Sequence, residues 1–309
     1  MKVYSGIEKL PAFKNAVVTI GTFDGVHLAH RKLISKINEL ALENEGESVI
    51  VTFDPHPRKI LNPGDPRLKI LTTLDEKISL LEKSGVHNLV ITEFSTAFSQ
   101  MLPEEYITDF LVKYFHPRIV VIGYNHRFGR NRSGDVELLR KLSASFHYEV
   151  ELITKQTIEE VDISSTLIRE ALMRGDIKSA NQMLGHPYRF SGKVVEGDKR
   201  GNMIGFPTAN IELNEDDKIL PMDGVYAVRA WMNESDIHSG MMNIGFRPTM
   251  DGLNHKIEVH LFNFNHNIYG EILSVEPVVL LRREQKFNSL EELIQQLKRD
   301  KAAALNALI

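Results

Sequence analysis

The sequence predicts two domains of different class: an α/β domain with a parallel sheet in the first half, and an antiparallel β-barrel with a terminal helix in the second. Three observations lead to this prediction. The chain has 309 residues, about twice the length of an ordinary single domain. In its first half, short apolar runs alternate with amphipathic segments, which is typical of a parallel sheet with helical crossovers. In its second half, strand-like runs follow one another through turns rich in Gly, Asn, Asp and Pro.

Five runs of the first half are apolar on both faces, as expected of strands in a covered parallel sheet. They are residues 16–20, 48–53, 88–92, 119–123 and 148–153. Helical patterns are expected at 27–43, 75–84, 103–115 and 135–145, with two more at 165–173 and 177–184. Because such sheets bind ligands beyond the carboxyl ends of their strands, the residues that follow these strands are candidates for a site.

After Gly185, the spacing of the apolar residues becomes that of successive strands. Strands are expected at 188–196, 225–232, 256–264 and 272–281, and a helix at 290–298. Within 256–264, Ile257 and Val259 alternate with Glu258 and His260, as in a half-buried strand. We therefore expect one domain over residues 1–185 and a second over 186–309, joined by a short turn.

Composition excludes several classes of protein. The 37 basic and 41 acidic residues sum to 37 − 41 = −4, which argues against a dedicated nucleic-acid binder. The absence of cysteine excludes disulfides, thiolate nucleophiles, iron–sulfur clusters and cysteine zinc sites. No run approaches the roughly 18 apolar residues of a membrane span, and the first 20 residues do not form a signal peptide. We expect a soluble cytoplasmic protein without nucleic-acid or membrane partners.

Residues 21–30 follow the first strand and open the first long helix. Gly21 and Gly25 permit a tight turn, and a helix N-terminus offers N–H groups and a positive dipole end to a phosphate. His27 and His30 are three residues apart and share a helical face. From these residues alone two other interpretations stay open. One is an ordinary strand-to-helix turn, and the other is a two-histidine metal site, although no third ligand lies at metal spacing nearby.

A second segment carries hydroxyls at a helix start. Ser164, Ser165 and Thr166 can cap the first N–H groups, and Arg169 lies four residues beyond Ser165. Alone, this segment is equally an N-cap followed by a solvated arginine. Together with the His-x-x-His turn, it favours a phosphate site.

The segment 192–211 holds the densest group of candidate phosphate and metal ligands. Gly197, Gly201 and Gly205, with Lys199 and Arg200, could wrap a phosphate, although the spacing is not that of a P-loop. Thr208 and Asn210 offer neutral oxygens on one face of a strand, which suits Mg²⁺ when nucleotide phosphates complete its shell. Glu258 could serve as a general base. The alternatives are a turn-rich hairpin and an outward-facing glutamate of the barrel.

The first half resembles a known family. Its strand-end His-x-x-His and its Ile-Ser-Ser-Thr-x-x-Arg are similar to the two signatures of the nucleotidylyl transferases, which have Rossmann-like domains. The segments 21–27, 54–57 and 123–129 resemble those of the FMN adenylyltransferase module of bacterial FAD synthetases. Two positions depart from that pattern: Ala29, where many members have Gly, and His126, where an aromatic residue is usual.

This resemblance implies roles for individual residues. His27 and His30 would contact the phosphates of ATP, and Asn125 would lie near the reacting phosphates. Ser164, Ser165 and Arg169 would hold the triphosphate. Further candidates for contacts to the ATP phosphates are Gly21, Asp24 and Arg127.

The second half resembles the riboflavin kinase family. Its Gly-Phe-Pro-Thr-Ala-Asn motif at 205–210 is followed, in the order of that family, by the segments 223–226, 243–249, 258–260 and 282–287. The resemblance implies that Thr208 and Asn210 bind Mg²⁺–ATP, that Glu258 is the base acting on the riboflavin 5′-hydroxyl, and that Arg282 lies at the flavin end. Gly197, Lys199 and Gly205 would contact ATP.

We therefore expect a bifunctional enzyme that phosphorylates riboflavin to FMN with ATP and then adenylylates FMN to FAD, releasing pyrophosphate. Mg²⁺ would serve both steps, with riboflavin, FMN and ATP as the small-molecule partners. The alternatives are a protein with one active domain and a flavin-binding protein that has lost catalysis. The oligomeric state stays open.

Overall fold

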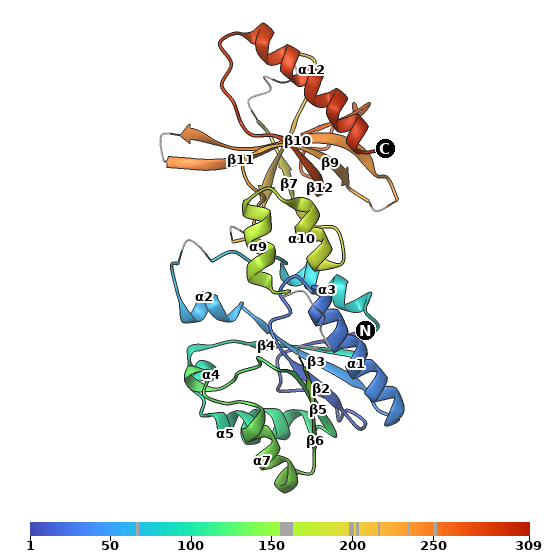
Figure 1. The fold of residues 1–309 in the computed structure, drawn as a ribbon, viewed down its shortest axis with the longest axis vertical. Coiled ribbons are helices and arrows are strands. Elements are labelled where there is room, and N and C mark those ends of the chain that lie inside the picture. The colour runs from blue at the N-terminus through green and yellow to red at the C-terminus, as the bar shows by residue number, and fades with distance from the viewer. Residues whose placement is uncertain are drawn as a thin grey trace. The chain divides into compact units, whose positions relative to one another are not determined.

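The computed structural model describes residues 1–65, 68–154, 163–197, 201, 204–215, 217–233, 235–249 and 252–309, with backbone only for 246–249 and 252–255. The chain divides into two compact units, Met1–Ser164 and Ser165–Ile309 (Figure 1). Each unit is described by itself. The predicted fold class, a parallel α/β domain and a β-barrel domain, is confirmed.

The first unit contains a six-stranded sheet in the order β1-β4-β3-β2-β5-β6, in which every strand pair is parallel. Its strands are β1 (Lys2–Ser5), β2 (Val17–Ile20), β3 (Ser48–Asp54), β4 (Asn88–Glu93), β5 (Ile119–Gly123) and β6 (Glu149–Ile153). The five predicted strands are all present. The sequence pattern misses β1 because this edge strand is short and mostly exposed, so it carries no apolar run.

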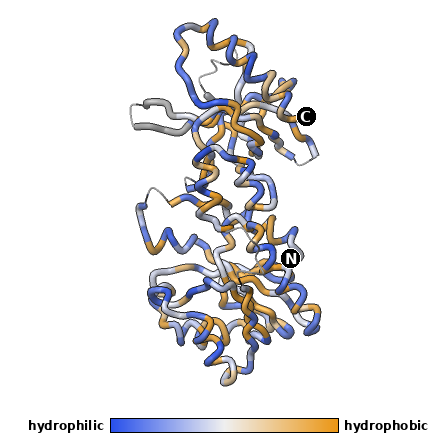
Figure 2. Tube along the Cα trace, viewed as in Figure 1, coloured by the Kyte–Doolittle hydropathy of each residue, from blue (hydrophilic) through white to orange (hydrophobic). Residues whose placement is uncertain are grey.

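Two apolar clusters cover the two faces of this sheet, and neighbouring residues of a strand join different clusters. Val18 and Val49 belong to one cluster, whereas Val17 and Ile50 belong to the other. Burial on both faces explains why these strands are continuous apolar runs rather than alternating ones. Figure 2 shows the same concentration of hydrophobic residues along the strands.

The helices of the first unit supply the other side of each cluster. The longest are α1 (Leu28–Glu43), α3 (Leu74–Glu82) and α7 (Val136–Phe146). The predicted helix at 103–115 is built from α5 (Pro103–Glu105), a π-helical stretch η1 (Tyr106–Val112) and α6 (Lys113–Phe115). Shorter elements are α2 (Pro57–Leu61), α4 (Thr96–Ser99) and the 3₁₀ turn η2 (Arg130–Arg132). Helix α3 begins with a capping box between Thr73 and Glu76, which fixes its start beside the sheet.

The second unit contains a closed antiparallel barrel in the order β10-β11-β8-β7-β12-β9. Its strands are β7 (Phe190–Val195), β8 (Ala209–Leu213), β9 (Gly224–Trp231), β10 (His238–Thr249), β11 (Gly252–Leu261) and β12 (Ile272–Arg282). Four were predicted; β8 and β10 were not. β8 is short, and β10 is interrupted by Gly240 and Gly245, so neither gives a strong apolar pattern.

Helices α9 (Ser165–Met173) and α10 (Ile177–Leu184) belong to the second unit. The Met222 amide donates a hydrogen bond of 2.9 Å to the carbonyl of Leu172, and the Tyr188 amide donates one of 2.7 Å to Asn181 Oδ1. Contacts therefore divide the chain after Ser164. The division at 185 expected from the sequence stays a prediction for the extent of the two catalytic parts.

The two faces of the barrel wall differ. Ile257, Val259, Met242 and Ile244 are buried and form one face. The expected exposure of His260 on the other face is wrong, because its side chain is only 6% exposed. Phe262, two residues further on, is likewise 6% exposed.

The terminal helix explains this burial. Helix α12 (Leu290–Ala307) packs against β9, β10 and β12. Its Ala304 joins a buried cluster with Phe206, Met241 and Phe262 on the outer face. The helix runs beyond the predicted end at 298, through the strong helix formers of 301–305. Among the described helices, none is long and apolar enough to cross a membrane.

Candidate active sites

The turn between β2 and α1 brings two imidazole rings together. His27 caps α1, and its Nδ1 accepts a hydrogen bond of 3.4 Å from the backbone N–H of His30. The two rings stack with their centroids 3.7 Å apart and their planes at 14°. No acidic residue lies in the first turn of α1. The positive end of the helix dipole is therefore not offset by a carboxylate of that turn, which favours an anion.

His30 is held as a neutral imidazole. Burial, followed by the neighbouring His27 and Lys77, lowers the pKa of His30 well below its ordinary value. Its ring lies 5.0 Å from that of Phe23, and the described residues supply no hydrogen-bond partner for its buried Nδ1. A neutral ring can donate one N–H and accept one hydrogen bond, so His30 can orient a phosphate oxygen without a fixed charge.

Asp24 holds the turn between β2 and α1 in place. Its Oδ1 accepts hydrogen bonds from the amides of Leu71 and Thr72, at 2.9 and 3.1 Å, and from the Thr72 hydroxyl at 3.3 Å. The Thr72 hydroxyl oxygen also accepts one of 3.0 Å from the amide of Gly25. This buried carboxylate thus fastens the turn to the segment before α3. Contact of Asp24 or Gly21 with ATP stays a prediction.

Lys77 is a cation that sequence reasoning missed. It is 5% exposed, and its ammonium donates to Thr52 Oγ1 at 3.4 Å. Thr52 in turn donates to the carbonyl of Thr22 at 3.2 Å. Within the helical pattern 75–84 this lysine is indistinguishable from a surface residue, so only the folded structure reveals a positive charge beside the histidine pair.

The loop after β5 leaves the sheet at the same edge as this turn, because β2 and β5 are parallel neighbours. Asn125 is exposed in this loop, where it could meet a ligand. Arg127 pairs with Asp135 at 3.3 Å and is 45% exposed. Burial, together with Arg132 and Arg127, lowers the pKa of His126 to about 4. The sheet therefore brings Asn125 and Arg127 to the edge that carries His27 and His30.

Ser164, Ser165 and Arg169 lie where the two units divide. Ser164 ends the first unit, whereas Ser165 begins α9 in the second. Arg169 is on α9, with a side chain 9% exposed. That these three residues bind the triphosphate of ATP stays a prediction.

The second site is a row of side chains across four barrel strands. Asn210 of β8 lies directly opposite Glu258 of β11, which in turn lies opposite Asn243 of β10. Val195 of β7 continues the row beside Asn210. Directly opposite residues of antiparallel strands share a face, with Cβ atoms about 5 Å apart. Two amides thus flank the carboxylate of Glu258, and all three side chains are partly exposed.

Glycine makes room for this row. A Cβ atom at Gly197 would lie 2.0 Å from Asn210 Nδ2, so any larger residue would displace the amide. Gly205 has a φ of +79°, a conformation that favours glycine, and it turns the chain into the 206–208 segment. Lys199 lies outside the described residues.

The segment before β8 is anchored to the barrel. Phe206 is buried in the cluster under α12. His260 Nδ1 lies 2.7 Å from the carbonyl oxygen of Pro207, directly before Thr208. Burial lowers the pKa of His260, and Lys301 adds to this, against the opposing effect of the hydrogen bond. The anchored backbone leads through Thr208 to Asn210, which lies in the row opposite Glu258.

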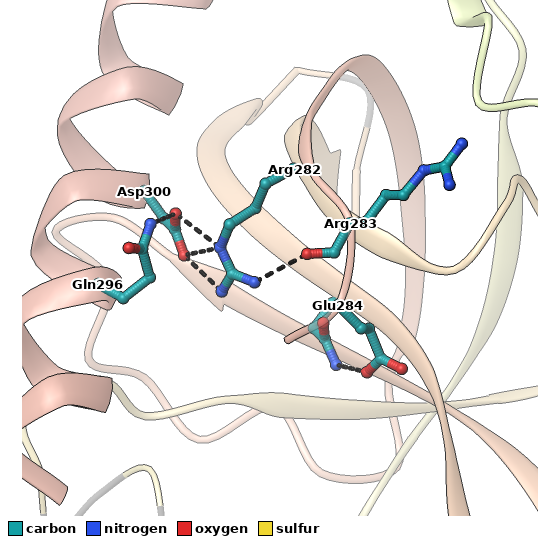
Figure 3. A network of polar contacts seen from close by, with 6 residues as sticks. Arg282, Arg283, Glu284, Gln296 and Asp300 are labelled. Atoms are coloured by element: carbon teal, nitrogen blue, oxygen red, sulfur yellow. Dashed lines mark hydrogen bonds and ion pairs between the residues drawn. The ribbon is translucent and has the colours of Figure 1, made fainter. Parts of the chain in front are cut away.

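Arg282 is occupied by a buried ion pair rather than left free. Its Nε lies 3.0 Å from both carboxylate oxygens of Asp300, and its Nη2 lies 2.8 Å from Oδ2 (Figure 3). Asp300 is 3% exposed and also accepts from Gln296 at 2.8 Å. Arg282 thereby fastens β12 to α12. The geometry supports this structural role, and contact of Arg282 with flavin stays a prediction.

Glu284 is a further carboxylate near the row, and sequence reasoning gave it no role. Its Oε1 accepts a hydrogen bond of 3.3 Å from Asn243 Nδ2 (Figure 3). Glu284 packs over Gly245, where a Cβ would lie 1.9 Å from Oε1. The Arg-x-Glu-x-Lys-Phe segment at 282–287 could have drawn attention to Glu284. Its partner Asn243, however, lies on β10, a strand that the sequence did not predict.

One unit thus offers a helix N-terminus with two imidazoles for phosphates, and the other a carboxylate flanked by amides. Helix N-termini can bind phosphates and a carboxylate can take the proton of an attacking hydroxyl, so the two units together are suited to a two-domain transferase that acts on phosphates. Residues 9–167 match the family model described as FAD synthetase, and residues 184–308 match that described as riboflavin kinase.

Three relatives extend this finding. A bifunctional riboflavin kinase/FMN adenylyltransferase of Listeria monocytogenes is 40% identical over 93% of this chain and 90% of its own length. One of Escherichia coli K12 is 37% identical over 98% and 97%. A crystal structure from Streptococcus pneumoniae, described as a macrolide-efflux protein, is 31% identical and covers 99% of each chain with a TM-score of 0.88.

The chain belongs to the bifunctional riboflavin kinase/FMN adenylyltransferase family. It is an enzyme of flavin-cofactor synthesis that phosphorylates riboflavin to FMN with ATP and adenylylates FMN to FAD with release of pyrophosphate.

Replacing Asp300 should destabilise the barrel. Asp300→Ala leaves the Arg282 guanidinium without its carboxylate, and we expect a loss of roughly 2 to 3 kcal/mol, somewhat less than for a fully buried pair. Trp231 in β9 is the only tryptophan, so its fluorescence during urea unfolding reports on this unit. Arg299→Ala, on the exposed side of α12, is the control. Equal unfolding midpoints for the two variants would contradict the structural role.

The neutral state of His30 is testable by NMR. Its ring resonances, assigned by their loss in His30→Gln, should stay unshifted between pH 8 and 5.5, because its pKa is lowered well below the ordinary value. An unperturbed imidazole titrates near pH ~6.5. A midpoint close to that value would show that His30 is neither buried nor close to other cations.

Proposed function

We propose that the two reactions use separate sites: the barrel wall at Glu258 for the kinase, and the β2–α1 turn at His27 and His30 for adenylyl transfer. The observation that carries the first assignment is the strand register that sets Asn210 opposite Glu258. The observation that carries the second is the stacked histidine pair at the start of α1.

In the kinase reaction, Glu258 would accept the proton of the riboflavin 5′-hydroxyl as its oxygen attacks the γ-phosphorus of ATP. The new O–P bond forms while the bond to the β,γ-bridging oxygen breaks, and ADP leaves. Such transfer depends on positioning and charge neutralisation more than on covalent catalysis. A partly exposed carboxylate on a rigid strand meets the first need, since its reach is fixed by the neighbouring strands.

With Glu258 as the base, the residues at the row would meet Mg²⁺ through neutral oxygens. Among the described residues, no group of three or more His, Cys, Asp or Glu could hold a metal ion. Thr208 and Asn210 would then supply the hydroxyl and amide oxygens, and the space that Gly197 leaves for the Asn210 amide agrees with this. Bound Mg²⁺ neutralises phosphate charge, and its octahedral shell is usually completed by phosphates and water. Gly205 and Lys199 remain candidates for contacts to ATP.

In the adenylyl transfer, an FMN phosphate oxygen attacks the α-phosphorus of ATP and pyrophosphate leaves. The nucleophile is already an anion, so the site needs no general base. His27, His30 and the N-terminus of α1 would orient the ATP phosphates, and Asn125 and Arg127 would approach from the neighbouring strand end. We assign Ser164, Ser165 and Arg169 to the triphosphate on the family resemblance.

Paired substitutions should separate the reactions. Glu258→Gln should lower FMN formation from riboflavin by about 10²- to 10⁴-fold, the usual contribution of a general base, while FAD formation from added FMN continues. His30→Ala should do the reverse. Flavin products are resolved by chromatography after incubation with ATP and Mg²⁺. The assignment fails if either variant, still folded, loses both reactions.

The same assay decides between the alternatives. FAD made from riboflavin by the unaltered chain requires two active sites, whereas FMN as the end product would indicate a kinase alone. Unchanged riboflavin would indicate a flavin-binding protein. The presence of both the histidine pair and the Asn–Glu row supports two active sites. The cytoplasmic location expected from the sequence also stays a prediction.

A further inference from the structure

His260 lies on β11 two residues after Glu258, and the two side chains therefore leave the strand on the same face. Their surroundings differ. Glu258 is partly exposed, whereas His260 is 6% exposed. The ring of His260 packs against Phe206 and Phe262, and its Nδ1 lies at the Pro207 carbonyl. These contacts connect His260 to the backbone that leads to Thr208.

The hydrogen bond of His260 fixes its tautomer. Its Nδ1 lies 2.7 Å from the carbonyl oxygen of Pro207. A carbonyl oxygen only accepts hydrogen bonds, so the proton must be on Nδ1. The bond joins the strand that carries Glu258 to the backbone directly before Thr208.

The ring itself has little freedom to turn. Phe206 packs against it edge-to-face at 5.3 Å between centroids, and Phe262 does so at 5.6 Å. The ammonium of Lys301, from α12, lies 5.2 Å from the centre of the Phe262 ring. Helix α12 thus closes over the group, so the donor on His260 points at Pro207 with a fixed direction.

Among the described residues, the segment 206–208 has few other anchors. Phe206 is buried, and its amide donates to the carbonyl of Gly201 at 2.9 Å. Ladder pairing of β8 with β11 begins only at Ala209. Pro207 has no N–H to contribute. The position of Thr208 therefore depends on the carbonyl that His260 holds.

We propose that His260 is a positioning residue of the kinase site: its Nδ1–H holds the Pro207 carbonyl and thereby sets the oxygens of Thr208 and Asn210 beside Glu258. This inference rests on the proposed role of Thr208 and Asn210 toward Mg²⁺–ATP. By this proposal, β11 carries both the base, Glu258, and the residue that positions the nucleotide ligands, His260.

Two amide variants distinguish this role from simple packing. In His260→Asn, the side-chain amide nitrogen takes the place of the imidazole Nδ1, so a donor to Pro207 is kept. In His260→Gln, the amide reaches the place of Nε2 and the donor is lost. Both variants lose the ring, which makes them a matched pair for stability.

The first readout is binding rather than turnover. Mg²⁺–ADP that binds the folded barrel raises its unfolding free energy, and Trp231 fluorescence reports on that unit alone. We expect His260→Gln to bind Mg²⁺–ADP about tenfold more weakly, as for one lost hydrogen bond. His260→Asn should recover most of this affinity. Equal losses in both variants would overturn the proposal in favour of packing.

The second readout is kinetic. His260→Gln should raise the KM for ATP in FMN formation about tenfold and leave the KM for riboflavin nearly unchanged. FAD formation from added FMN is the internal control and should be unaffected. An unchanged KM for ATP in His260→Gln would also overturn the proposal.

Thr208→Ala separates this inference from the proposed function. If Thr208→Ala binds Mg²⁺–ADP as well as the unaltered chain does, Thr208 has no part in nucleotide binding and the proposed function fails at this residue. If Thr208→Ala weakens binding while His260→Gln does not, the proposed function stands and only the role of His260 is refuted.

Discussion

Antiparallel register is the constraint on which the proposed kinase site depends. Asn210 lies on β8, far in the sequence from Asn243 and Glu258 on the consecutive strands β10 and β11, yet the three residues lie opposite one another because hydrogen bonds fix the pairing. A slip of one residue would send Glu258 to the apolar face and bring Val259 to the outer one. Since Ile257 and Val259 are buried on the apolar face, such a slip would also expose core residues. The free energy of the core therefore maintains the alignment of the site.

In the first unit, the pairing of parallel strands likewise brings candidate site residues together. Chain segments that follow β2 and β5 emerge at one edge of the sheet, because the strands are parallel neighbours. Asp24 is central here although it is an anion in a turn that we propose to bind phosphates. Its carboxylate accepts three hydrogen bonds from the Leu71–Thr72 segment, which fasten the turn before α1 to the segment before α3. Lys77 adds a positive charge that the local sequence does not show.

Two charged residues at and just after the end of β12 contact different parts of the second unit. Arg282 and Glu284 are two residues apart, but Arg282 turns to Asp300 of the terminal helix and Glu284 turns to Asn243 of the barrel wall. The first contact holds α12 in place, and α12 in turn buries His260 and Phe262. The packing of the terminal helix is thus connected, through His260 and Phe206, to the segment 206–208 before β8.

The sequence by itself determined the fold class, five of the six strands of the first sheet and the identity of most candidate residues. Apolar runs and turn residues are local patterns, and the motifs lie within short segments, so both are visible without a structure. Strands β8 and β10 were not predicted, because their short length and their glycines weaken the pattern. Only the tertiary structure decided that His260 is buried, that Arg282 is occupied by Asp300, that Lys77 lies by the histidines, and that Asn210 faces Glu258. The physical reason is that burial and pairing are set by segments distant in the chain, and no local pattern carries that information.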